Sequence, residues 1–198
     1  MHPNPAFRQE TAAQNLDFAR ARGFGALCVN GADGPLLAHI PFEMGGGDRL
    51  RLHLARSNAI ARADLPCPAV MAVMGPDGYI SPDWYGAADQ VPTWNYIAVH
   101  LRGTLSRLPD ETLEPHVNTV SETFESRLAP KQIWRSSKMS PGVMDRMMRA
   151  ILPFQLQITA VEGTWKLGQN KTPQARAGAI AGLRALGMDE LADHMQKV

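Results

Sequence analysis

The sequence predicts an α+β protein that is mainly antiparallel β, with about six strands in a small closed or half-closed barrel and helices at its periphery. Several segments alternate apolar and polar residues, as strands with one buried face do, and the clearest are residues 49–55 and 94–107. Tight-turn sequences such as GADG at 31–34 separate neighbouring segments. The regular strand–helix alternation of a doubly wound parallel sheet is missing.

The first half of the chain predicts a helix followed by an antiparallel meander. Thr11 and Gln14 form a capping-box pattern at the start of a helix that Gly23 ends, after an extended arm that Pro3 and Pro5 favour. The expected strands are 24–30, 35–43, 49–55 and 68–75, with turns at 31–34, 45–48 and 75–78, and a short helix is expected after residues 57–58.

The second half predicts two more strands and several helices. The strand at 94–107 is the most amphipathic of the chain, and apolar residues at helical spacing follow it from Leu113 to Leu128. Ser140 and Pro141 start a helix whose methionines and Ile151 should face inward. A closing strand is expected at 154–167, and helices at 172–186 and 189–196. We expect residues 1–198 to form a single domain, with the helical segment 172–198 packed on it.

Composition and charge argue against a few classes of function. The chain is 44% hydrophobic and 20% charged, which suits a globular core, and its net charge of +1 gives no bulk attraction for nucleic acid or membranes. The opening residues lack the apolar stretch of a signal peptide. Cys28 and Cys67 are the two cysteines, and they form no CxxC pair. We therefore expect two buried thiols in a reducing compartment and a cytoplasmic protein.

The common catalytic motifs are absent. We find no GxSxG, no phosphate loop, no GxGxxG after a strand and no HExxH. His39 and His53 lie on strands one hairpin apart, so a shared metal is conceivable, but the histidines show no ligand spacing within one element and we predict no metal site.

Three local signals point to a ligand. Residues 79–103 concentrate aromatic side chains, among them Trp84, Tyr85 and Trp94, on a loop and the following strand. The sequence LARSN at 54–58 places an arginine and two polar residues where a strand meets a helix start, a favourable place for a phosphate. Residues 163–172 end a strand in a polar turn. Each signal has an ordinary structural alternative: a packed aromatic corner, a capped helix and a polar turn. Together they fit a planar phosphorylated cofactor.

These segments resemble the PaiB family, bacterial proteins described as FMN-binding negative transcriptional regulators. The resemblance runs nearly from end to end, through MHPNPAF, HIPF, HLARSN, YISPDWY, VPTWNYIAVHLRG, MMRAILPFQLQIT and EGTWKLGQNK. The motifs VPTWNY and WKLGQN are the specific ones. His2 stands where the family usually has tyrosine, and Gly168 where it often has serine, which leaves the role of the N-terminal arm open.

The resemblance implies a six-stranded split β-barrel of the FMN-binding type, dimeric about a two-fold axis, with FMN in each of two grooves between subunits. His39, Ile40, Pro41 and Phe42 would run beside the flavin ring, and Arg56, Ser57 and Asn58 would hold the phosphate. Trp94 and Asn95 would approach the flavin, with Trp84 and Tyr85 in the same aromatic wall. Lys166, Gln169 and Asn170 would reach in from the partner subunit.

Three functions stay open at this stage. The first is an FMN-binding regulator or sensor, and the second is a flavin-dependent oxidoreductase, a reductase or oxidase acting on a small acceptor. No catalytic residue is assigned, although His39, Tyr85 and His100 are acid–base candidates. The third is direct DNA binding by a helix–turn–helix at 172–198, against which Asp189, Glu190 and Asp193 on its second helix argue. If the protein regulates transcription, we expect an indirect route.

Overall fold

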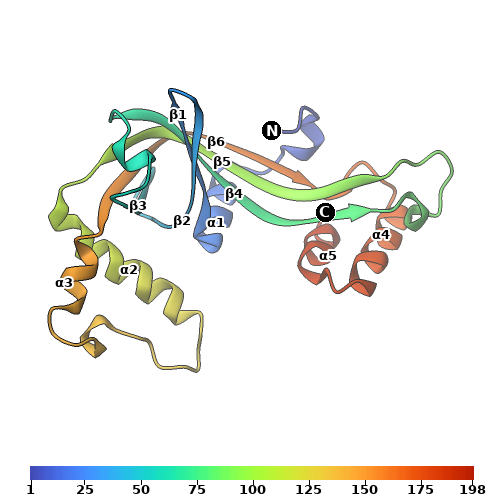
Figure 1. Ribbon diagram of the computed structural model, residues 1–198. Helices are drawn as coiled ribbons and strands as arrows, with labels where there is room; N and C mark the ends of the chain where they lie inside the picture. The colour runs from blue at the N-terminus through green and yellow to red at the C-terminus, as the bar shows by residue number, and fades with distance from the viewer. The chain divides into compact units, whose positions relative to one another are not determined.

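Six β-strands and five α-helices, joined by short 3-10 turns, make up residues 1–198, all of which the computed structural model describes (Figure 1). In chain order the elements are η1 (Pro5–Phe7), α1 (Ala12–Arg22), β1 (Phe24–Gly31), β2 (Gly34–Met44), β3 (Arg49–Ala55), η2 (Ile60–Arg62), β4 (Cys67–Ile80), η3 (Pro82–Tyr85), β5 (Thr93–Arg107), η4 (Asp110–Thr112), α2 (Leu113–Ser126), η5 (Ser136–Lys138), α3 (Val143–Met148), β6 (Ile151–Lys166), α4 (Pro173–Ala185) and α5 (Asp189–Gln196).

The strands close into a barrel in the order β1-β2-β3-β6-β5-β4. Strand β1 pairs antiparallel with β2 and β4, and β3 pairs antiparallel with β2 and β6. The predicted α+β class, with a six-stranded antiparallel barrel and peripheral helices, is confirmed. No helix combines the length and the apolar composition that crossing a membrane requires.

The chain groups into two compact units, and each is described by itself. The helical unit comprises Met1–Phe18, Met74–Val99 and Glu162–Val198, and the barrel unit comprises Ala19–Val73 and His100–Val161. The long strands β4, β5 and β6 contribute residues to both units. That the whole chain behaves as a single domain stays a prediction.

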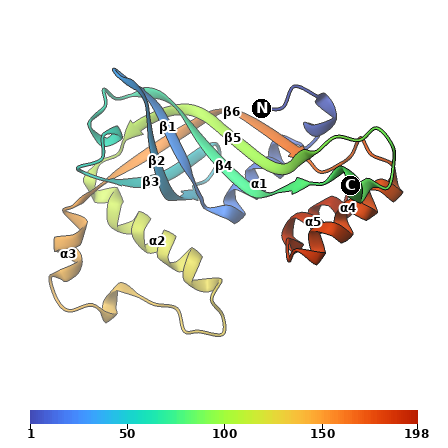
Figure 2. The same ribbon diagram turned by 45° about the vertical axis from the view of Figure 1, so that its right-hand side comes forward.

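Alternating leucines build the core of the barrel unit. On β3, Leu50, Leu52 and Leu54 are buried, while the residues between them face outward. Inside the barrel they join the buried side chains of Phe42 and Phe154. Both ribbon views show α2 and α3 on one side of the barrel strands (Figure 2).

One glycine lets two strands of the barrel unit approach closely. A Cβ atom added to Gly103 on β5 would lie 1.9 Å from the carbonyl oxygen of Gln157 on β6. No side chain fits in that space, so the contact requires glycine at this position.

The helical unit has its own core, formed by α4 and α5 against η3 and the neighbouring strand residues. The buried side chains include Ile80, Tyr85, Ile97, Leu183 and Leu191. The predicted helix starts hold here: the Thr172 hydroxyl accepts the N–H of Ala175, as an N-cap does. At the other end of the chain, the Thr11 hydroxyl and the Gln14 amide cap the start of α1 reciprocally, which confirms the predicted capping box.

The turn predicted at residues 75–78 is wrong, because β4 continues through it from Cys67 to Ile80. The two glycines serve close packing instead of a turn. A Cβ atom on Gly75 would meet the Phe18 ring at 2.6 Å, and one on Gly78 would meet the Met188 methyl at 2.8 Å. Glycine therefore marks a close approach here.

Three predicted helical details also change. The helix expected from residue 140 is shorter: α3 starts after Gly142, whose φ is 74°, and Met147 is exposed. Ile151 instead begins β6. After β3 there is only the three-residue turn η2, and the Asn58 carboxamide oxygen accepts the Ile60 N–H at 2.9 Å. The expected extended arm contains the turn η1, which Asn4 caps.

Candidate cofactor site

The strand predicted to run beside a flavin presents only half of its side chains. Ile40 and Phe42 point into the barrel core and are 7% and 2% exposed, whereas His39 is exposed and Pro41 is half-buried. Side chains alternate across a strand, so His39 and Pro41 lie on its outer face. Ile40 and Phe42 can offer a ligand on that face only their backbone atoms.

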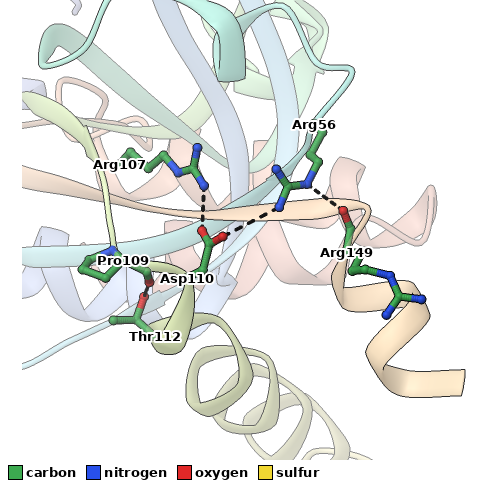
Figure 3. A network of polar contacts seen from close by, with 6 residues as sticks. All are labelled: Arg56, Arg107, Pro109, Asp110, Thr112 and Arg149. Carbon is green, nitrogen blue, oxygen red and sulfur yellow. Dashed lines mark hydrogen bonds and ion pairs between the residues drawn. The ribbon is translucent and has the colours of Figure 1, made fainter. Parts of the chain in front are cut away.

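Arg56, at the end of β3, is held by two neighbours in the barrel unit (Figure 3). Its Nε donates to the carbonyl oxygen of Arg149 at 2.6 Å, and its Nη2 lies 3.8 Å from Oδ2 of Asp110. The other oxygen of Asp110 accepts from Nη2 of Arg107 at 2.6 Å. These side chains are solvent-exposed, so the ion pairs add little stability, but they fix where the guanidinium lies.

The other two residues of this corner differ in their freedom. Ser57 is exposed, whereas the carboxamide oxygen of Asn58 is already used to cap η2. Beside them, Arg56 and Asp110 line a pocket of about 500 Å³ whose far wall carries Met144 and Met148 of α3. The corner therefore offers a guanidinium and a hydroxyl to an anion, and Asp110 is the internal competitor for the guanidinium.

A second pocket, of about 270 Å³, lies within the helical unit and gathers four of the predicted residues. These are Tyr85, Asn95, Lys166 and Asn170. Residues that the sequence did not predict complete the lining: His2, Asn4, Phe7, Val91, Thr93, Gly168 and Lys171. No aspartate or glutamate lines this pocket.

Two lysines carry the charge of the helical-unit pocket. Nζ of Lys166 donates to the Thr93 hydroxyl at 2.5 Å, and Nζ of Lys171 donates to Oε1 of Gln90 at 2.6 Å and lies 4.5 Å from the centre of the Tyr85 ring. Burial, and then the charge of Lys171, lower the pKa of Lys166. Burial also raises the pKa of Tyr85. The pocket is thus positively charged and partly shielded from water.

Two predicted residues have structural tasks in the helical unit. Gln169 closes its own turn: Nε2 donates to the Trp165 carbonyl oxygen at 2.5 Å and Oε1 accepts the Leu167 N–H at 2.8 Å. Trp84 packs against α4, where Cβ atoms on Gly178 or Gly182 would collide with it. These contacts explain the presence of Gln169 and Trp84 by their structural roles, without a ligand.

Trp94 and Asn95 are adjacent on β5 but have opposite surroundings. Trp94 is 54% exposed, with its ring edge-on to Tyr79 at 6.3 Å. Asn95 is 1% exposed, and its amide nitrogen donates to the sulfur of Met195 at 3.4 Å. Sulfur is a weak acceptor, so this buried amide is weakly bonded.

The N-terminal arm belongs to the helical-unit pocket. The backbone N–H of His2 donates to the Thr164 hydroxyl at 3.1 Å, and the His2 ring meets the buried Phe7 ring edge-on at 4.8 Å. The prolines and the sequence similarity indicated an arm but not where it packs, because its contacts on β6 are about 160 residues away.

The barrel unit contains a further cluster that the sequence did not predict: Glu43 on β2, His53 on β3 and His116 on α2. Nδ1 of His116 donates to Oε1 of Glu43 at 2.8 Å, since a carboxylate can only accept. Nε2 of His116 lies 3.1 Å from Nδ1 of His53. His116 is buried, so the cluster joins α2 to the outer face of β2 and β3. Its members are far apart in sequence, and no local spacing reveals them.

We expect the protein to lose stability on acidification through His53. Burial first, and the charge of His116 second, lower the pKa of His53 below the ordinary 6.5. The folded state then binds fewer protons than the unfolded chain, so the free energy of unfolding falls as the pH drops from 6.5 toward the lowered pKa. Urea unfolding at several pH values between about 8 and 5 measures this slope.

The variant His53→Gln should flatten that slope. The same change at exposed His39, also on a barrel strand, is the control and should leave it unaltered. Equal slopes in His53→Gln and the parent would show that another group carries the pH dependence.

A family model described as "Putative FMN-binding domain" matches residues 1–160. The Bacillus subtilis protein named protease synthase and sporulation protein PAI 2 is 28% identical over 169 residues, which are 83% of this chain and 80% of that protein.

Two solved structures show the same fold. The FAD and heme binding protein from Mycobacterium smegmatis has a TM-score of 0.61 at 16% identity, covering 87% of this chain and 80% of that one. A conserved hypothetical protein from Mycobacterium tuberculosis has a TM-score of 0.58 at 16% identity, covering 86% and 94%. At such identities the likeness concerns the fold alone. The split-barrel architecture that we predicted is confirmed.

Proposed function

Because the chain belongs to the family of FMN-binding domains, we propose that it is a PaiB-type sensor or regulator that binds FMN between the subunits of a homodimer. The resemblance to the PaiB family is confirmed by the family match and the Bacillus subtilis relative, and FMN as the cofactor is confirmed by the family match. The regulatory role, the dimer and the individual contacts are the proposal.

The exposed guanidinium of Arg56 carries the proposed placement of FMN. A phosphate dianion fits beside it, because guanidinium and the Ser57 hydroxyl both donate hydrogen bonds and the pocket next to them is open. We place the flavin ring along the outer face of His39 and Pro41. FMN, when bound, would supply electron- and hydride-transfer chemistry.

The proposed dimer supplies the remaining wall. Trp94, Asn95, Tyr85, Lys166 and Asn170 would face the flavin from the partner subunit, with Trp84 and Gln169 supporting them. Large apolar side chains exposed in each unit favour such an isologous interface; they are Phe24 and Leu37 in the barrel unit and Met74, Tyr79 and Trp94 in the helical unit. Sedimentation equilibrium tests it: a monomer at micromolar concentration, with and without FMN, would contradict the shared site.

Replacing Arg56 with alanine should weaken FMN binding about tenfold to a hundredfold, since hydrogen bonds to a charged partner contribute about 1.5–3 kcal/mol. Titration of the apoprotein by flavin fluorescence quenching measures this. Riboflavin has no phosphate, so its affinity should not change. Arg62→Ala, an exposed arginine in the nearby turn η2, is the matched control. If Arg56→Ala binds FMN as the parent does, the phosphate lies elsewhere.

The alternative function is a flavin-dependent oxidoreductase. One observation favours it: burial lowers the pKa of Lys166 in the helical-unit pocket. Residues with shifted pKa values in a pocket are common in enzyme active sites. NADH consumption that depends on FMN would favour an enzyme, and its absence with several acceptors would favour a sensor.

Direct DNA binding is the third alternative. Helices α4 and α5 bury Leu183, Leu191 and Met195 in the helical unit, and Nη2 of Arg184 on α4 is paired with Asp193 on α5 at 3.1 Å. We therefore propose that any regulation acts through a partner or a metabolite. A gel shift at low salt, where electrostatic binding is strongest, would contradict this. Cys28 and Cys67 are half-buried, not buried as predicted, and neither forms a disulfide, which fits the proposed cytoplasmic location.

A further inference from the structure

The two lysines of the helical-unit pocket have no acidic partner. Lys166 is bonded to a hydroxyl and lies 6.0 Å from the centre of the Phe7 ring, and Lys171 is bonded to an amide and lies over the Tyr85 ring. By contrast, Arg107 meets the carboxylate of Asp110, and Arg184 meets that of Asp193. Two ammonium groups with only neutral partners leave an uncompensated positive charge in a concave site.

Burial makes this charge unfavourable in the ligand-free protein. The pKa of Lys166 is lowered because its ammonium group is desolvated and is repelled by Lys171. An anion between the two groups would offset the lost hydration and the repulsion, because an opposite charge favours the charged form of each amine. The charge is therefore better suited to holding a ligand than to stabilising the fold.

The rest of the lining indicates which anion fits. Its neutral polar side chains can donate hydrogen bonds to a carboxylate; they are Asn95, Asn170 and Thr93. The rings of Phe7 and Tyr85 supply flat apolar surface. At about 270 Å³ the pocket suits a small molecule. One charged end and one flat apolar part describe a small aromatic carboxylate.

We propose that this pocket binds a small aromatic carboxylate, with the carboxylate between Lys166 and Lys171 and the ring against Phe7 and Tyr85. The proposal rests on the proposed function in one respect: FMN has a single phosphate, which that function assigns to Arg56. Although Lys166 faces the flavin in that function, its ammonium group and that of Lys171 receive no anion from the cofactor. We assign both to a second ligand next to the flavin, which serves as the effector of a sensor or the substrate of an enzyme.

Isothermal titration with benzoate tests the site, in low salt and with FMN-saturated protein. We expect Lys171→Met to weaken benzoate binding about tenfold or more, because a charged hydrogen bond is lost, and Lys171→Arg to retain most of it. Lys197→Met, an exposed lysine of the same unit outside the pocket, is the control. Inorganic phosphate, which lacks the flat apolar part, should bind more weakly than benzoate.

Proton uptake gives a second readout that does not depend on a variant. Because a bound anion raises the lowered pKa of Lys166, benzoate binding should take up protons at alkaline pH, where the free amine begins to form, and its heat should then differ between buffers of different ionisation enthalpy. Absence of uptake throughout an alkaline pH series would overturn the role of Lys166.

The two proposals fail in different ways. If benzoate binds the FMN-free protein and FMN displaces it, or if Lys171→Met lowers FMN affinity while Arg56→Ala does not, the lysines hold the cofactor and the second ligand is refuted. If Arg56→Ala leaves FMN binding unchanged but benzoate still depends on Lys171, the placement of FMN fails and the carboxylate site stands. If benzoate binds neither the FMN-free protein nor the FMN-saturated protein, the carboxylate site is refuted.

Discussion

Replacing Gly103 with alanine should destabilise the barrel by about 3 kcal/mol, at the upper end of what overpacking costs. The new Cβ atom would lie 1.9 Å from the carbonyl oxygen of Gln157, and that neighbour is backbone, which cannot rotate away. Strands β5 and β6 would have to separate locally, breaking pairing in the middle of the barrel. For a chain of this length we expect the midpoint of thermal unfolding to fall by about 6–12 °C.

Gly46→Ala is the matched control for this prediction. Gly46 lies in the turn between β2 and β3, with no atom within 4 Å of a Cβ position. The same chemical change there should be neutral or stabilising by about 0.4–1 kcal/mol, since alanine restricts the unfolded chain. Similar midpoints for Gly103→Ala and Gly46→Ala would mean that β5 and β6 do not approach as closely as described.

Alanine at Gly182 should also destabilise the protein, although alanine favours helices by about 1 kcal/mol over glycine. Its Cβ atom would lie 2.3 Å from the indole ring of Trp84, and overpacking of this kind costs about 1–3 kcal/mol or more. We expect a net loss of about 2 kcal/mol in urea unfolding. Ala181, the preceding residue of α4, is exposed, so Ala181→Gly should show only the propensity cost of about 1 kcal/mol.

A double-mutant cycle makes this prediction sharper. In a Trp84→Ala background the obstacle is gone, so Gly182→Ala should change sign and stabilise the protein. Additive effects in the double variant would instead show that Trp84 does not rest on this face of α4.

Sequence patterns predict an element correctly where its residue types favour only one local structure. The alternating leucines of β3 and the Thr11–Gln14 capping box are of this kind, and their boundaries agree with the structure within a residue or two. Glycine is ambiguous, because it permits both a turn and a close approach. Gly75 and Gly78 permit close packing against the helical-unit core, so β4 continues where we predicted a turn.

The candidate site divides along the same line. Tyr85, Asn95, Lys166 and Asn170 share a pocket, and their motifs are adjacent to strand ends that periodicity locates well. His2 and Phe7 reach the same pocket through packing of the N-terminal arm, which no local pattern encodes. The Glu43–His53–His116 cluster depends in the same way on where α2 docks on the barrel unit.

The contact between Arg56 and Asp110 bears on how the proposed phosphate corner would discriminate among flavins. In the ligand-free protein, Asp110 orients the guanidinium of Arg56. A phosphate that binds this guanidinium must displace the Asp110 carboxylate. Binding then exchanges one exposed ion pair for another, and a doubly charged phosphate that also accepts from Ser57 would be favoured over the singly charged carboxylate. A corner arranged in this way would select FMN over riboflavin by charge.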